Sequence, residues 1–202
     1  MKRILFVALL ALTLPLAAFA NSVDFNGVGG TLSGLSSGLT LSGTGLTTVV
    51  GLDGLGTVAG TGLGSISLST GALLSSVYTG GVLTSATFAG GSFTVTGNGI
   101  DGIPAGVIFT GTFTGNVTMS GAAGSGYVVY GQFSGTLSGG GTLSGVLSIT
   151  TSLSGKNGYT GRLGVGSVDI SGGSAVPEPS TLGLLGSGLF GLGALVRRKI
   201  KA

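Results

Sequence analysis

The stretch VIFTGTFTGNVTMSG, residues 107–121, alternates between apolar and polar positions over most of its length. Every second residue is apolar or glycine, and the residues between them are mostly threonine. A two-residue period is typical of a β-strand with one buried and one solvated face. We therefore expect a buried face made of Val107, Phe109, Gly111, Phe113, Gly115, Val117 and Met119.

The same alternation returns further along the chain. It runs in phase through Tyr127, Val129, Phe133 and Leu137, and again through Leu143, Leu147, Ile149 and Leu153. Asn157-Gly158 is a strong signal for a two-residue hairpin turn. A last run over residues 159–170 leads to Gly172-Gly173-Ser174, which we interpret as a linker.

The fold class follows from these runs and from the glycines that interrupt their apolar face. Such glycines leave room for close approach of another backbone or for strong curvature. They are Gly111, Gly115, Gly131, Gly135 and Gly145. We expect an all-β fold, an antiparallel meander that forms a glycine-rich sandwich or barrel.

The first half of this region is less regular. Strands are expected over residues 84–88 and 92–96, with turns at Asn98-Gly99 and Asp101-Gly102. Residues 49–74 are compatible with short strands or with a glycine-rich loop.

Composition limits the chemistry that the chain can perform. Glycine supplies 45 of the 202 residues, only 6% are charged, and there is no Cys and no His. The chain therefore lacks the commonest general base and metal ligand, and it lacks thiol chemistry. Each aspartate is expected alone in a turn, at Asp24, Asp53, Asp101 and Asp169. We expect no enzyme, no catalytic residue, no cofactor and no metal site.

Charge argues against nucleic acid as a partner. Residues 21–176 contain two cationic side chains, Lys156 and Arg162, and the four aspartates, which gives a net charge of −2. A region without a basic stripe cannot release counterions from a phosphate backbone.

The N-terminus has the three parts of a secretory signal peptide. Lys2 and Arg3 form a basic start, residues 4–14 are apolar, and Ala18-Phe19-Ala20 is an A-x-A cleavage site. We expect residues 1–20 to be removed by signal peptidase, which would recognise Ala18 and Ala20.

The C-terminus combines a proline bracket, an apolar span and a basic end. Pro177 and Pro179 flank Glu178 and keep the backbone there extended. Residues 181–196 are uncharged, and they predict a short transmembrane helix. Arg197, Arg198 and Lys199 follow the span and favour the cytoplasmic side.

In this order, these features resemble the PEP-CTERM sorting signal, over residues 176–202 only. The resemblance implies a Gram-negative bacterium that makes exopolysaccharide. It also implies recognition by exosortase, a membrane-embedded cysteine transpeptidase-like enzyme that removes the tail. The chain would then have a signal peptide over 1–20, a β domain over 21–175 and a sorting signal over 176–202.

The expected product is a structural protein that passes through the membrane and is then secreted or held at the cell surface, associated with the extracellular polysaccharide matrix. The alternative is a surface-displayed module that binds glycan or ice. Thr110, Thr112 and Thr114 resemble the threonine arrays of ice-binding proteins, although we find that row once. The tyrosines, which could stack on sugars, are expected in the core or at its rim, at Tyr78, Tyr127, Tyr130 and Tyr159.

The strands between Gly106 and Gly155 contain no Lys, Arg, Asp, Glu or Pro. Natural sheets protect open edges with such residues. The edges there either close on themselves as a barrel or pair with another copy, and we expect self-association through them.

Overall fold

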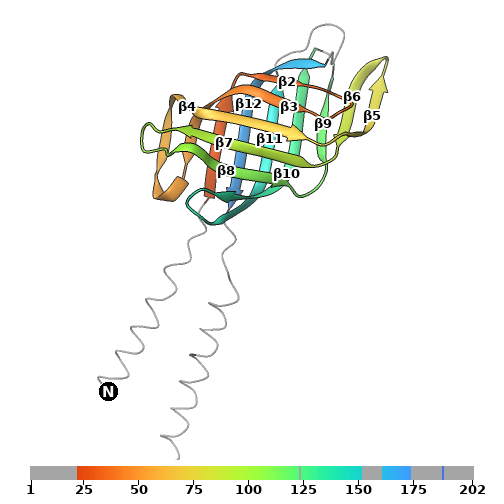
Figure 1. Ribbon diagram of the computed structural model, residues 1–202. Coiled ribbons are helices and arrows are strands. Elements are labelled where there is room, and N and C mark those ends of the chain that lie inside the picture. Colours follow the sequence, from red (N-terminus) through yellow and green to blue (C-terminus); the bar gives the residue numbers. More distant parts are fainter. Residues whose placement is uncertain (1–21, 123, 152–160, 174–187, 189–202) are drawn as a thin grey trace, which may run out of the picture. The chain divides into compact units, whose positions relative to one another are not determined.

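The computed structural model describes residues 22–122, 124–151, 161–173 and Gly188. Residues Asn21–Ser174 form one compact unit. Its described strands all pair in antiparallel fashion (Figure 1). They are β1 (Ser22–Val28), β2 (Thr31–Ser33), β3 (Thr40–Val50), β4 (Thr57–Thr70), β5 (Leu73–Thr79), β6 (Val82–Phe88), β7 (Gly91–Asn98), β8 (Ala105–Phe113), β9 (Val117–Ala122), β10 (Gly126–Leu137), β11 (Thr142–Thr151) and β12 (Arg162–Gly173).

These strands close into an eight-stranded antiparallel barrel. Four neighbouring pairs act as single long strands with a short break: β1 with β2, β4 with β5, β6 with β7, and β8 with β9. Each long strand pairs with the next in the chain, and β12 closes the circle against β1, with Ser22 opposite Gly173. Of the two expected architectures, the barrel is the one adopted.

The breaks fall at small residues that can leave the regular strand conformation. Between β1 and β2, Gly29 and Gly30 have φ angles of 70° and 93°. A Cβ atom at Gly30 would lie 2.7 Å from the carbonyl oxygen of Ser42. Only glycine allows both the left-handed backbone and this close approach.

Aromatic rings fill the inside of the barrel. Phe93 packs edge-on against Phe133, with ring centroids 5.1 Å apart, and it also contacts Phe109 and Phe113. Such edge-to-face pairs are favourable beyond their burial alone. The expected inward face of β10 is confirmed, because Tyr127, Val129 and Phe133 are buried while Val128, Tyr130 and Gln132 are exposed.

The close approach of another backbone that was expected at the glycines is confirmed at Gly135 and Gly145, whereas Gly111 and Gly131 make room for side chains. Phenylalanine rings lie against Gly111, Gly131 and Gly135, and the backbone of β12 lies against Gly145. At Gly115, in the break between β8 and β9, a Cβ atom would have nothing within 4 Å, so no close approach to that position is seen.

Two residues of the predicted buried face, Val107 and Gly115, are exposed. Val107 is 52% exposed, whereas Ile108 is fully buried beside Phe109. The register between β7 and β8 shifts at this point, so that Val95 pairs with Phe109 and Thr96 with Val107. This β-bulge reverses the alternation, which is why the strict two-residue period failed there.

The remaining expectations for this region divide into three groups. Strands over 84–88 and 92–96 are confirmed as parts of β6 and β7. Residues 49–74 contain the end of β3, a 3-10 turn at Leu52–Gly54, all of β4 and the start of β5. The prediction of a linker at Gly172 and Gly173 is wrong, because both residues belong to β12 and pair with β1 and β11.

Several expected features fall outside the described residues. These are the signal peptide over 1–20, the hairpin turn at Asn157-Gly158, and the Pro-Glu-Pro bracket with its span over 181–196. Within the part of the chain that the structure describes, no helix is long and apolar enough to cross a membrane.

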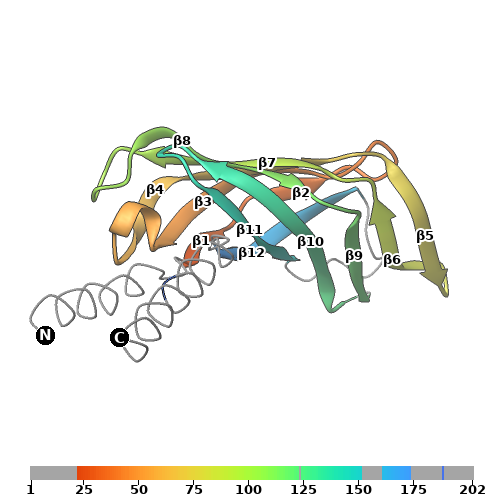
Figure 2. The same cartoon turned by 90° about the horizontal axis from the view of Figure 1, so that it is seen from below.

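Figures 1 and 2 show the β5–β6 hairpin at one margin of the sheet. β6 is flanked by β5 and β9, whereas β5 pairs with β6 alone among the described strands. Among the described strands, β5 is therefore the one with a neighbouring strand on one side only.

Candidate functional site

The residues expected to carry sorting and processing lie outside the described part of the chain. They are Ala18, Ala20, Pro177, Glu178, Pro179, Arg197, Arg198 and Lys199. Within the barrel, the candidate features are its aspartates, a surface depression and its outer wall.

Two of the four aspartates lie in strands, which corrects the expectation that all occupy turns. Asp24 belongs to β1 and Asp169 to β12, and they lie diagonally across that strand pair. Asp24 accepts a hydrogen bond of 2.7 Å from Ser171 Oγ. Asp53 and Asp101 occupy turns as expected, with φ angles of 48° and 53°.

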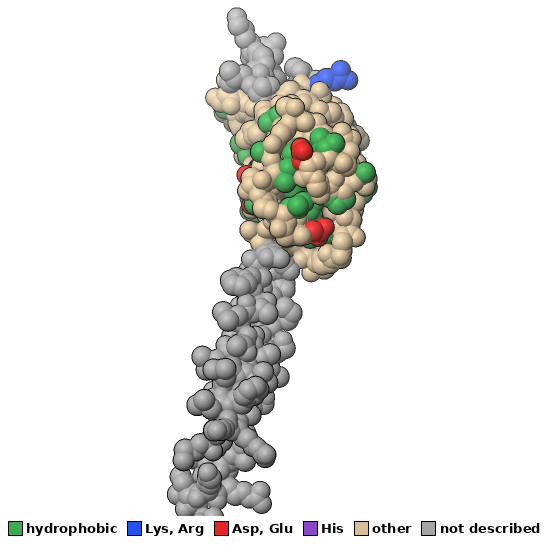
Figure 3. Space-filling model, turned by 90° about the vertical axis from the view of Figure 1, so that its left-hand side faces the viewer, with side chains coloured by type: hydrophobic (Ala, Val, Ile, Leu, Met, Phe, Trp, Pro, Cys, Tyr) green, Lys and Arg blue, Asp and Glu red, His purple; other side chains and the backbone are tan. Residues whose placement is uncertain are grey.

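The described residues contain no group of three or more side chains that could hold a metal ion. Their charges are also few and scattered, as one side of the molecule shows (Figure 3). Arg162 is the only Lys or Arg among the described residues. This part of the surface therefore has no cationic groove that could bind a phosphate backbone.

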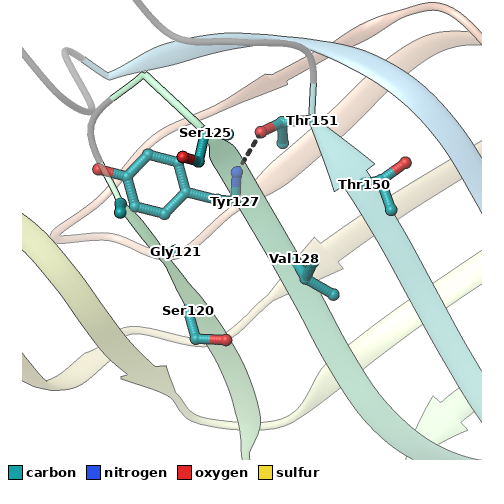
Figure 4. Close-up of a pocket in the computed structure, with 9 residues that line it drawn as sticks. Ser120, Gly121, Ser125, Tyr127, Val128, Thr150 and Thr151 are labelled. Atoms are coloured by element: carbon teal, nitrogen blue, oxygen red, sulfur yellow. Dashed lines mark hydrogen bonds between the residues drawn. The ribbon is translucent and has the colours of Figure 1, made fainter.

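An open depression of about 500 Å³ lies where β9, β10 and β11 meet (Figure 4). Its lining is formed by Ser120, Gly121, Ala122, Ser125, Gly126, Tyr127, Val128, Thr150 and Thr151. Thr151 Oγ1 accepts a hydrogen bond of 2.8 Å from the backbone N–H of Tyr127. The Tyr127 phenol donates to the carbonyl of Leu83 at 2.8 Å. The Thr151 hydroxyl and the Tyr127 phenol thus already take part in hydrogen bonds between strands. The depression therefore offers a ligand little besides hydroxyl groups.

The tyrosines divide between the core and the surface. Tyr127 is buried as expected, whereas Tyr130 is 44% exposed on the outer wall and Tyr78 is exposed on β5. Tyr130 pairs with Thr118 on one side and with Ser148 on the other. Ser148 in turn pairs with Asp169. We call the row Thr118, Tyr130, Ser148 and Asp169 the Tyr130 face.

Hydroxyl groups cover another part of the outer wall in two adjacent rows. The first row is Ser69, Ser92, Thr112, Ser134 and Ser144, and the second is Ser67, Thr94, Thr110, Thr136 and Thr142. The Oγ of Ser67 and the Oγ1 of Thr94 are 2.7 Å apart. The threonine row found once in the sequence is therefore one strand of a lattice that crosses five strands. Thr114 lies beyond β8, which ends at Phe113, and its hydroxyl donates to the carbonyl of Gln132.

Comparison with known proteins identifies the C-terminal signal. Residues 175–199 match the family model of the PEP-CTERM protein-sorting motif, which confirms the resemblance. This motif is a signal recognised by exosortase, and it implies export to the cell surface or beyond. No curated protein and no solved structure matches the chain.

Proposed function

We propose that the barrel is a structural protein that exosortase and signal peptidase process and deliver to the extracellular polysaccharide matrix. The observation that carries this proposal is the position of the sorting motif. β12 ends at Gly173 and the motif begins at residue 175. Removal of the motif would leave every strand and every core residue of the barrel in place.

The build of the barrel supports a structural role. Its inside is filled by aromatic and aliphatic side chains from all eight long strands. Its outer wall carries mostly hydroxyl groups, which suit contact with a hydrated matrix. We propose no catalytic activity for it.

Variants of the proline bracket test the sorting step. The changes Glu178→Ala and Pro179→Ala should leave the protein in the membrane fraction, because the extended bracket is the proposed recognition element. Ser180→Ala is the matched control, and it should be released like the unaltered protein. Immunoblots of membrane and medium fractions give the readout. Normal release of both bracket variants would overturn the proposal.

The Tyr130 face favours a second candidate function, glycan binding. An exposed tyrosine ring offers an apolar platform for the C–H face of a sugar, with a polar tip for its hydroxyls. Asp169 lies two strands away, at roughly 10 Å, which successive sugar rings of a chain could span. A charged acceptor at that point would strengthen a hydrogen bond from a sugar hydroxyl.

A pull-down with exopolysaccharide from the producing cells tests this candidate. Tyr130→Ala should reduce the bound fraction, whereas Tyr78→Ala, at the exposed tyrosine of β5, should not. Equal binding by both variants, or no binding by the unaltered protein, would exclude the Tyr130 face.

The hydroxyl lattice favours ice binding as a further alternative. Strands are spaced at about 4.8 Å, so the two rows present hydroxyls at a regular interval. Thermal hysteresis of the unaltered protein that disappears in Thr94→Lys would support it. Absence of hysteresis would exclude it.

A further inference from the structure

We propose that β5 is an interface at which two copies of this chain pair through their strand edges. The inference goes beyond the proposed function, since sorting and delivery do not require association. It also replaces the expectation that the edges between residues 106 and 155 drive self-association. The described strands in that range, β8 to β11, have neighbours on both sides.

The first argument is the unpaired backbone of β5. The N–H of Leu73 donates to the carbonyl of Ser36 at the end next to the barrel. Beyond that point, β5 pairs only with β6 within the described residues. The side of the strand away from β6 therefore presents backbone donors and acceptors that another strand could pair with.

The second argument is the apolar character of the same strand. Leu74, Val77 and Tyr78 are each more than half exposed. Because Val77 and Tyr78 are consecutive, these apolar side chains lie on both faces of the strand, and a strand paired alongside β5 would partly cover each face. Elsewhere in the described barrel, exposed large apolar side chains occur on β1, β8, β10 and the loop at Ile100, singly or in one pair.

The third argument concerns charge, and it identifies the occupant as a second copy. No Lys, Arg, Asp or Glu occurs between Asp53 and Asp101, so neither β5 nor β6 carries a charge that would repel an identical edge. Natural sheets commonly prevent such pairing with Lys or Pro on the edge, and β5 has neither. An uncharged apolar strand complements itself in a symmetric antiparallel pair.

The register of β5 suggests where the two-fold axis would lie. Register shifts against β6 occur between Leu73 and Ser75 and again between Val77 and Tyr78. The regular segment between these shifts is centred on Ser76, which pairs with Ala86. In an antiparallel pair centred there, the two copies of Ser76 would face each other with Cα atoms about 4.5–5.5 Å apart.

Cysteine cross-linking tests this arrangement directly, because the chain contains no cysteine of its own. The fragment 21–174 is suitable, since it contains the closed sheet and the whole described core. Under mild oxidation, Ser76→Cys should give a disulfide-linked dimer, because the expected Cα separation suits a disulfide. Thr112→Cys, on the exposed face of the fully paired strand β8, is the matched control and should remain monomeric.

Sedimentation provides a second measurement, which for the unaltered fragment does not depend on the position of the axis. The unaltered fragment should dimerise at roughly 10–100 μM, the weak range that a small interface supports. Ser76→Lys should raise the dissociation constant by at least about tenfold through two facing charges. Thr112→Lys should leave it unchanged, and circular dichroism should show the same fold for all variants.

Two results would overturn the proposal. One is a monomeric unaltered fragment at those concentrations, the outcome expected if residues 152–160 of the same chain cover the edge. The other is a dimer that Thr112→Lys weakens as much as Ser76→Lys does, which would place the interface on another surface.

Discussion

The ring of Phe93 lies directly against the backbone of Gly111, the residue opposite it across β7 and β8. The ring cannot move away easily, because Phe109, Phe113 and Phe133 surround it. The absence of a side chain at residue 111 is thus a condition for the aromatic core.

This contact predicts a strong effect of Gly111→Ala. The new methyl group would collide with Phe93, and we expect a loss of about 1–3 kcal/mol in the free energy of unfolding, as for other overpacked cores. Gly115→Ala is the matched control, because nothing lies within 4 Å of its Cβ position. Urea denaturation of both variants gives the comparison. Equal stability of the two would contradict the packing described.

Tyr127→Phe should destabilise the barrel although it removes a single oxygen atom. The phenol joins β10 to the carbonyl of Leu83 in β6 through a buried hydrogen bond. Its removal leaves that carbonyl without this donor, at a cost of about 1–3 kcal/mol. Tyr130→Phe changes the same atom at an exposed position and should be nearly neutral. Thermal denaturation distinguishes them, and a similar melting temperature for both would show that the buried bond contributes nothing.

The β-bulge can be tested at two adjacent residues. Ile108→Ala should reduce the free energy of unfolding by about 2–5 kcal/mol, because it opens a cavity among buried side chains. Val107→Ala should change it by about 0.5 kcal/mol or less, as at other surface positions. Chemical denaturation of both variants is sufficient. If Val107→Ala were the more harmful change, the strict alternation of the sequence would be right and the bulge wrong.

The intact mass of the released protein tests both processing steps together. We expect a chain that begins near Asn21 and lacks residues 181–202, as removal of a signal peptide and a sorting tail requires. Mass spectrometry of protein from the medium measures both ends in one experiment. A released chain that retained its tail would contradict sorting by exosortase.

The alternating strands were predictable because their side chains report their environment. Phe133 and Val129 are buried and their neighbours exposed, and the sequence pattern indicates the same. The bulge at Ile108 was not predictable, because it depends on which residues of β7 lie opposite. Glycine carries no side chain to report a buried or exposed position, which explains the errors at Gly172 and Gly173.

The candidate surfaces were predictable only in part. The row containing Thr110 and Thr112 was visible in the sequence, but the lattice was not. It depends on the registers that place Thr94 and Thr136 beside Thr110. The exposed Tyr130 and the open edge of β5 depend in the same way on which strands close the barrel. The sorting motif was recognisable because its features follow one another in the sequence, and the family match over residues 175–199 confirms it.

The closure of the barrel between β1 and β12 also constrains when folding can finish. Ser171 and Asp24, which are joined by a hydrogen bond, lie 147 positions apart in the chain. Contacts so distant in sequence make folding slow, because a long loop must close before they form. In an exported chain the first strand emerges early and keeps one edge unpaired until the last strand follows it. The sorting motif begins two residues after that last strand. Closure of the barrel by β12 therefore has to wait until the residues immediately before the motif have been exported.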